Sequence, residues 1–225
     1  MRRVAITRAL PEAERTAQHV RDFGATPIVA PLLTIVPCGY DTSTQDAQAL
    51  VFTSSNGVHA FPNARGARDM PVFAVGETTA AAARAAGFLS VRSANGDVNA
   101  LAALIKSTLS PAGGKLIHIG GAHLAGDLAG QLAQSGFTLD RRVAYAAVPA
   151  SVAPAAFAEP LDLVLFHSAR AAETFIALGA PGSERLVAGC LSPAVAEAAR
   201  AARWKALIVS PAPREDALLG ATLRE

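Results

Sequence analysis

The chain has 225 residues, a formal net charge of +2 and 51% hydrophobic residues. A chain of this length forms one large domain or two small ones, and its small net charge with no dense basic run argues against nucleic-acid binding. No segment approaches a membrane span or the apolar core of a signal peptide, and Cys38 and Cys190 have no metal-ligand spacing. We therefore expect a cytoplasmic protein with reduced thiols that binds neither membranes nor nucleic acid.

Short apolar runs alternate with helical patterns along the whole chain. A strand is predicted at residues 4–7, a helix to about residue 23 with Gly24 as its stop, and a strand at 26–30. Residues 31–37, bounded by prolines, indicate an extended segment at a sheet edge. Strands and helices continue to alternate further along the chain. Strands are predicted at 50–52, 72–75 and 89–92. One helix is predicted at 80–86, with Thr78 as its cap, and another helix is predicted to end near residue 109. This alternation is typical of α/β proteins with parallel sheets.

An internal repeat runs through the chain. Phe52, Ser54 and Phe61 recur as Phe166, Ser168 and Phe175 at a constant offset of 114 residues. The repeat extends upstream, where residues 4–8 match 116–120, and downstream, where 72–88 match 188–204 with a small drift. A strand that ends in small polar residues before a helix offers unpaired N–H groups to an anion, although an ordinary capped turn would look the same. The chain therefore contains two copies of one α/β unit.

The order and spacing of these segments resemble the uroporphyrinogen-III synthase family of tetrapyrrole biosynthesis over nearly the whole chain. The resemblance rests on VAITR at 4–8, FTSSNGV at 52–58, VFAVG at 72–76, VAY at 143–145, LFHS at 165–168 and LSP at 191–193. It implies two similar parallel-sheet lobes joined by a two-strand linker, with the first lobe discontinuous. On this basis the lobes are residues 1–35 with 150–225, and 36–149, with crossings near 33–38 and 143–149.

Ligands of open α/β sheets bind beyond the carboxyl ends of the strands. The predicted strand ends carry hydroxyls, amides and glycines rather than a nucleophile with a base, and we take as candidate substrate-binding residues Arg8, Ser54, Ser55, Asn56, Gly76, Thr78, Ser168 and Ser192. Six of them match cleft positions of the family: Arg8, Ser54, Asn56, Thr78, Ser168 and Ser192. The chain departs from the commoner family pattern at Ala9, which replaces a proline, and at Ala194, which replaces a hydroxyl.

Tyr145 is the candidate catalytic residue, because the family has a tyrosine at this place facing its cleft. A tyrosine packed at a domain edge is the alternative. The resemblance implies that hydroxymethylbilane, a linear tetrapyrrole with eight carboxylates, loses its terminal hydroxyl as water. Its last pyrrole ring is then inverted and the macrocycle closes to uroporphyrinogen III. No cofactor and no metal are expected. We expect a monomer, with transient contact to the preceding enzyme of the pathway.

Two other functions remain open at this level. A two-lobed binding protein for an anionic small molecule would have the same pair of α/β lobes, although no signal peptide is expected. A flavodoxin-like signalling domain would carry acidic residues after its first strand, where this chain has Thr7 and Arg8.

Overall fold

The computed structural model describes residues 1–62, 66–124 and 126–224. The chain forms two compact units: Met1–Ile35 with Val148–Glu225, and Val36–Ala147. We call them the discontinuous unit and the central unit. The expected lobe boundaries differ from these by two residues at the second crossing.

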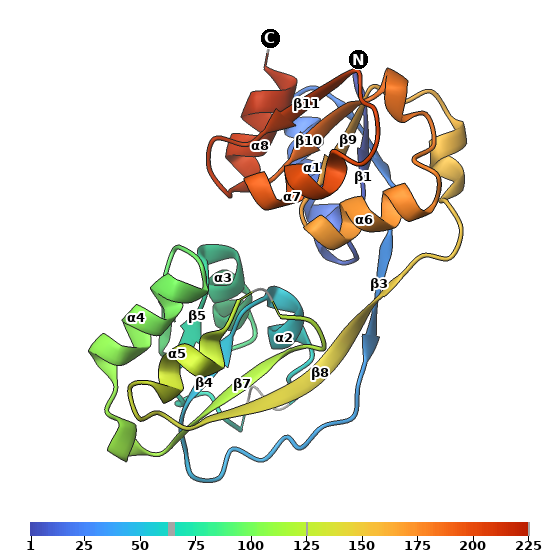
Figure 1. The fold of residues 1–225 in the computed structure, drawn as a ribbon. Helices are drawn as coiled ribbons and strands as arrows, with labels where there is room; N and C mark the ends of the chain where they lie inside the picture. The colour runs from blue at the N-terminus through green and yellow to red at the C-terminus, as the bar shows by residue number, and fades with distance from the viewer. Residues whose placement is uncertain (63–65, 125, 225) are drawn as a thin grey trace. The chain divides into compact units, whose positions relative to one another are not determined.

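The discontinuous unit is built on a five-stranded sheet in which every neighbouring pair is parallel. Across the sheet the order is β11 (Ala206–Val209), β10 (Val187–Cys190), β9 (Leu163–Phe166), β1 (Arg3–Ile6) and β2 (Thr26–Val29). Apolar side chains of β1 and β9 face α1 (Glu12–Asp22) and α8 (Glu215–Leu223). The helices α6 (Ala169–Ala177) and α7 (Pro193–Ala199) cover the other face (Figure 1). There Phe166 packs against Phe175 and Trp204.

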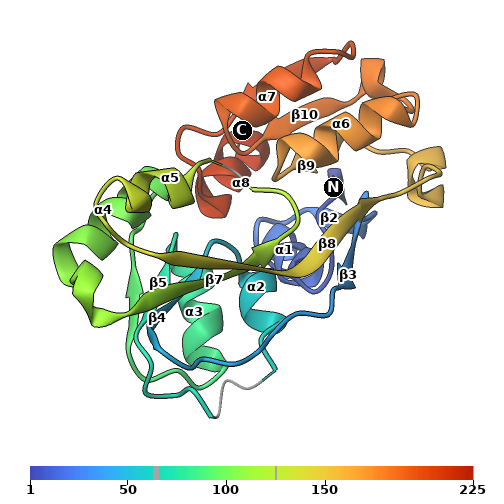
Figure 2. The same ribbon diagram turned by 60° about the horizontal axis from the view of Figure 1, so that its bottom comes forward.

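The central unit is built on a six-stranded sheet. Its order is β3 (Leu33–Pro37), β8 (Leu139–Pro149), β7 (Lys115–Gly121), β4 (Ala47–Phe52), β5 (Val72–Ala74) and β6 (Val91–Ser93), and the pairs from β8 to β6 are parallel. Because alternate residues of a strand point to opposite faces, Leu50 and Phe52 pack towards α2 (Ser55–His59) and α3 (Glu77–Ala85). Ala49 and Val51 pack towards α4 (Val98–Thr108) and α5 (Leu128–Ala133). These two helices lie on the opposite side of the sheet from α2 and α3 (Figure 2).

The two sheets have matching strand orders. Read from β2, the first sheet runs β2-β1-β9-β10-β11, and read from β8, the second runs β8-β7-β4-β5-β6. These orders equate β1 with β7, β9 with β4 and β10 with β5, as the sequence repeat does. The first copy therefore supplies β1 and β2 to one sheet and β4, β5 and β6 to the other, and the second copy does the reverse. The predicted fold class, two similar parallel-sheet lobes with the first one discontinuous, is confirmed.

Two strands pass from one unit to the other. The boundary between the units falls inside β3 and again inside β8. The Pro-bounded segment predicted at a sheet edge is β3, which lies at the edge of the six-stranded sheet. Within the described residues the connections include three short 3₁₀ helices: η1 (Pro111–Gly113), η2 (Ala155–Ala158) and η3 (Ser183–Arg185).

Local predictions are confirmed for most elements and wrong at one cap. The helix α1 ends before Gly24, whose φ of +76° suits a glycine stop. The helix predicted at 80–86 instead starts at Glu77, with Gly76 in extended conformation as its N-cap and no side chain capping it. Thr78 therefore lies in the first turn and is not the cap. The predicted strand at 89–92 is Val91–Ser93.

Candidate active site

The carboxyl end of β4 meets β7 and β8 through two pairs of polar side chains. Ser54 follows β4 in extended conformation and caps α2, its hydroxyl accepting a hydrogen bond from the Gly57 N–H at 3.3 Å. The same hydroxyl lies 2.6 Å from the hydroxyl of Tyr145 on β8. The sequence-predicted residues Ser54 and Tyr145, 91 positions apart, are thus brought into direct contact.

Glycines provide the space for this contact. Gly121 pairs with Tyr145 in the β7–β8 register, and a Cβ built on it would lie 2.8 Å from Tyr145 Cε2 and 2.9 Å from Cζ. The Tyr145 ring therefore lies directly against the bare backbone of β7. A Cβ on Gly57 would lie 2.4 Å from the Ile119 carbonyl oxygen, so the start of α2 approaches β7 closely because position 57 has no side chain.

The second pair joins Thr53 to His118. Thr53 Oγ1 lies 3.0 Å from His118 Nε2, and the His118 side chain is almost fully buried. Burial, with Arg141 as a smaller contribution, lowers the pKa of His118 from 6.5 to about 4. The imidazole is therefore neutral at physiological pH and ties β4 to β7 by a hydrogen bond without a charge.

The other candidate residues of the central unit lie along the same carboxyl edge, because the strands they follow are parallel. Ser55 is buried in the first turn of α2, and Asn56 beside it is half-buried. Gly76 is half-buried at the start of α3, and Thr78 is exposed in the first turn of that helix. The edge thus presents backbone N–H groups of two helix starts together with hydroxyl and amide side chains. Such groups bind carboxylates.

In the discontinuous unit, Ser168 and Ser192 occupy equivalent places. Ser168 follows β9 and accepts a hydrogen bond from the Ala171 N–H at 3.2 Å, capping α6. Ser192 follows β10 and accepts from the Val195 N–H at 3.4 Å, capping α7. Both are half-buried caps, so their hydroxyls take part in holding the helix starts at this edge of the sheet.

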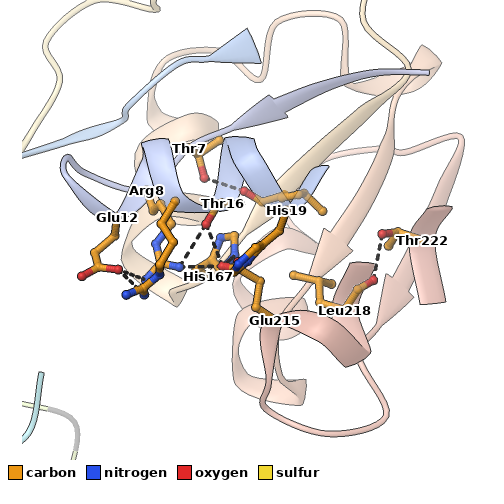
Figure 3. A network of polar contacts seen from close by, with 11 residues as sticks. Thr7, Arg8, Glu12, Thr16, His19, His167, Glu215, Leu218 and Thr222 are labelled. Carbon is orange, nitrogen blue, oxygen red and sulfur yellow. Dashed lines mark hydrogen bonds and ion pairs between the residues drawn. The ribbon is translucent and has the colours of Figure 1, made fainter. Parts of the chain in front are cut away.

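Arg8, which follows β1, belongs to a polar network centred on Glu215 (Figure 3). Arg8 Nη1 lies 2.8 Å from Glu215 Oε2, and Thr16 Oγ1 donates to the same oxygen at 2.6 Å. His19 Nδ1 lies 2.5 Å from Glu215 Oε1. The Arg8 guanidinium also approaches Glu12 at 3.9 Å. The positive charge of Arg8 is thus compensated by carboxylates of the same unit. From the sequence, Arg8 is among the candidate substrate-binding residues.

His167, the residue after β9, completes the network. Its Nε2 lies 3.3 Å from Glu215 Oε2, but neither ring nitrogen makes a well-aligned hydrogen bond to a described residue. The distance therefore describes an electrostatic contact. Burial lowers the pKa of His167, although the Glu215 carboxylate opposes this.

Glu215 is ionised in spite of its surroundings. Burial alone would raise its pKa, but the contacts with His167, Thr16 and His19 together outweigh burial and hold the pKa well below the ordinary value of a glutamate. Sequence reasoning missed this carboxylate because residues after the last strand were interpreted only as a short terminal helix. An acidic residue at the start of a helix, facing the end of a parallel sheet that carries Arg8, was the available signal.

The described residues offer no site for a metal ion. Among them there is no group of three or more His, Cys, Asp or Glu side chains that could hold one. Cys38 and Cys190 are both free thiols. None of the helices in the described ranges is long and apolar enough to cross a membrane.

Comparisons with known proteins identify the family. The model described as "Uroporphyrinogen-III synthase HemD" matches residues 14–220. No curated protein sequence matches the chain significantly. Among solved structures, uroporphyrinogen-III synthetase from Helicobacter pylori is similar with a TM-score of 0.70 and 15% identity, covering 99% of each chain.

A mutant uroporphyrinogen III synthase from Thermus thermophilus is also similar, with a TM-score of 0.56 and 18% identity over 97% of this chain and 96% of that one. At such identities the likeness of the structures concerns the fold, and the family assignment comes from the sequence model. Neither comparison favours a two-lobed binding protein. The chain belongs to the uroporphyrinogen-III synthase family.

Proposed function

We propose that the chain converts hydroxymethylbilane to uroporphyrinogen III as a cofactor-independent lyase, with Tyr145 assisting departure of the terminal hydroxyl. The reaction breaks the C–O bond of the hydroxymethyl group. The pyrrole nitrogen supplies the electron pair, and the departing oxygen takes up a proton and leaves as water. The methylene carbon left by the hydroxyl bonds to the substituted α-carbon of the terminal ring and gives a spirocyclic intermediate. The bond from that α-carbon to its original methylene bridge then breaks. This bridge bonds to the free α-carbon of the inverted ring, which loses its proton, and the macrocycle is closed.

The observation that carries the proposal is the Tyr145 hydroxyl at the carboxyl edge of the central sheet, 2.6 Å from Ser54. A phenol can donate a hydrogen bond to the oxygen as its negative charge develops. The neutral His118 nearby is buried and bonded to Thr53, so Tyr145 is the better placed donor of the two. The rest of the edge, with its helix-start N–H groups and hydroxyls, suits a substrate that is held by its carboxylates and folded for closure.

We further propose that the protein acts as a cytoplasmic monomer and takes the unstable substrate during transient contact with the enzyme that makes it. The transfer is supported by the chemistry: hydroxymethylbilane closes spontaneously to the symmetric type I isomer, so a short transfer limits the loss.

The isomer ratio tests the activity directly. The protein is incubated with hydroxymethylbilane, and the oxidised porphyrins are separated into types I and III. An excess of type III over the spontaneous reaction is expected, and type I alone would refute the proposed activity.

Tyr145→Phe tests the catalytic role, because it removes the hydroxyl and keeps the ring. We expect at least about tenfold slower formation of type III, at or below the low end of the roughly 10²- to 10⁴-fold typical of general-acid assistance, with unchanged folding. Tyr40→Phe is the matched control, since Tyr40 is the other tyrosine and its hydroxyl donates to the Ala60 carbonyl at 2.9 Å. A native rate in Tyr145→Phe would leave Tyr145 as a packed edge residue.

A further inference from the structure

The Ser54 hydroxyl makes two contacts with different consequences. One is the helix cap, in which the oxygen accepts from the Gly57 N–H. The other is the 2.6 Å contact with Tyr145 Oη. A serine hydroxyl has one hydrogen to donate and two positions to accept, so after the cap it still has its hydrogen and one accepting position.

The direction of the second hydrogen bond decides what Tyr145 can do. If Tyr145 donated to Ser54, its only hydrogen would be used inside the protein. If Ser54 donates to Tyr145, the phenolic hydrogen stays free for another acceptor, and the Ser54 hydrogen also stabilises the negative charge that grows on the phenolic oxygen as it gives up its proton. Only this second arrangement is compatible with Tyr145 as a donor to the leaving hydroxyl.

The ring of Tyr145 is fixed as well as its hydroxyl. The Tyr145 carbonyl accepts from the Ala122 N–H at 2.9 Å, and the ring lies against the backbone of Gly121. Tyr145 also packs against the apolar cluster that includes residues of α2 and α3. Ser54 lies at the junction of β4 and α2, and Tyr145 lies in β8. Both residues are therefore held by helices or strands and not by a loop. Groups held in this way keep the short distances that catalysis needs.

The internal repeat offers a comparison within the chain. Ser168 is the counterpart of Ser54 and caps α6 in the same way, with the Ala171 N–H at 3.2 Å. Both tyrosines of the chain, at 40 and 145, lie in the central unit. The cap is thus common to both copies, whereas the contact with a tyrosine belongs to Ser54.

We propose that Ser54 is a positioning residue that donates to the Tyr145 hydroxyl and directs the phenolic hydrogen towards the leaving group, instead of binding a substrate carboxylate itself. This inference rests on the proposed function. Because Ser54 acts through Tyr145, the effect of removing the Ser54 hydroxyl depends on the presence of the Tyr145 hydroxyl. The experiment measures this dependence.

The test is a double-mutant cycle with Ser54→Gly and Tyr145→Phe. Glycine removes the hydroxyl and is tolerated at a helix cap much better than alanine. We expect Ser54→Gly to lower kcat for type III formation about fivefold to tenfold, the value of one hydrogen bond, with KM changed less than about twofold. In the Tyr145→Phe background the same substitution should have no further effect, because its target is gone.

Controls separate positioning from capping. Ser54→Thr keeps the hydroxyl and should restore most of the rate. Asp97→Ala removes the N-cap of α4 in the same unit and should leave the rate unchanged. Ser54→Ala serves in the cycle if the glycine variant does not fold.

A wild type that makes type I alone refutes the proposed function. An active wild type in which Ser54→Gly loses the same factor in both backgrounds, or loses it mainly in KM, overturns the inference while the function stands. A native rate in Tyr145→Phe overturns both the catalytic role and the positioning role, and again the activity itself survives.

Discussion

Replacing His118 by glutamine should make the stability of the central unit less sensitive to acid. Burial lowers the pKa of folded His118 from 6.5 to about 4, whereas an unfolded histidine titrates near 6.5. As the pH falls, the unfolded chain therefore takes up the proton first. The stability associated with neutral His118 is complete above about pH 6.5 and is lost between about pH 6.5 and about pH 4.

The size of the effect follows from the two pKa values. A shift from 6.5 to about 4 corresponds to about 3 kcal/mol of unfolding free energy, since one pKa unit is about 1.4 kcal/mol. About 2 kcal/mol of it should be lost at pH 5. Glutamine does not titrate, and its amide can still bond to Thr53. Any constant destabilisation caused by the substitution cancels when the variant is compared with itself at two pH values.

The positions of the aromatic residues provide the assay. The single tryptophan, Trp204, lies in the discontinuous unit and both tyrosines lie in the central unit. Denaturant unfolding followed by the near-ultraviolet tyrosine signal, at about pH 7.5 and about pH 5, therefore reports the unit that contains His118. His59→Gln, at an exposed histidine of the same unit, is the control and should behave as the wild type. Identical pH dependence in wild type and His118→Gln would refute the reasoning.

Two further substitutions test other contacts. Glu215→Gln should destabilise the discontinuous unit by about 2 kcal/mol, because a partly buried carboxylate loses its ion pair with Arg8 and its electrostatic contact with the His167 ring. The folded pKa of Glu215 is lowered, so this difference should be full above about pH 4.3 and shrink below it. Trp204 fluorescence measures it, and Asp216→Asn, at an exposed ion pair with Arg214, should stay within about 0.5 kcal/mol of wild type. If Glu215→Gln also stays within about 0.5 kcal/mol of wild type, the network does not stabilise the unit. Gly121→Ala should displace the Tyr145 ring, since the new Cβ would lie 2.8 Å from it, and slow type III formation by about tenfold or more. Gly39→Ala, where a Cβ meets nothing within 4 Å, is its control, and equal rates in the two variants would contradict the proposed placement of the ring.

The fold could be predicted from the sequence because its signals are local or repeated. Buried strands, glycine stops and serine caps each depend on a few neighbouring residues, so Ser54, Ser168 and Ser192 are found where short-range chemistry places them. The exchange of strands between the copies needed the family resemblance as well. Periodicity alone gives the same pattern whether a copy folds on itself or with the other copy.

The contacts of the site could not be predicted in the same way. Arg8 and Glu215 are 207 positions apart, and nothing in the sequence near either residue specifies the other. Ser54 and Tyr145 meet because β4, β7 and β8 are neighbours and because Gly121 has no side chain. The cap wrongly predicted at Thr78 is a local error: Gly76 adopts the extended conformation that starts the helix two residues earlier.

The exchange of strands between the copies sets an order of events during synthesis on the ribosome. The central unit, Val36–Ala147, is made without interruption, so it can complete its sheet as soon as β8 emerges. The segment β1–α1–β2 is made first but must wait for β9, since Val4 pairs with Leu163. The 134 residues from Val29, the end of β2, to Leu163, the start of β9, take roughly 7 to 27 s at the usual ~5–20 residues per second. Translation that stops after β8 would release a folded central unit with an N-terminal strand that has an open edge on the side of β9, which is the kind of surface that chaperones and proteases recognise.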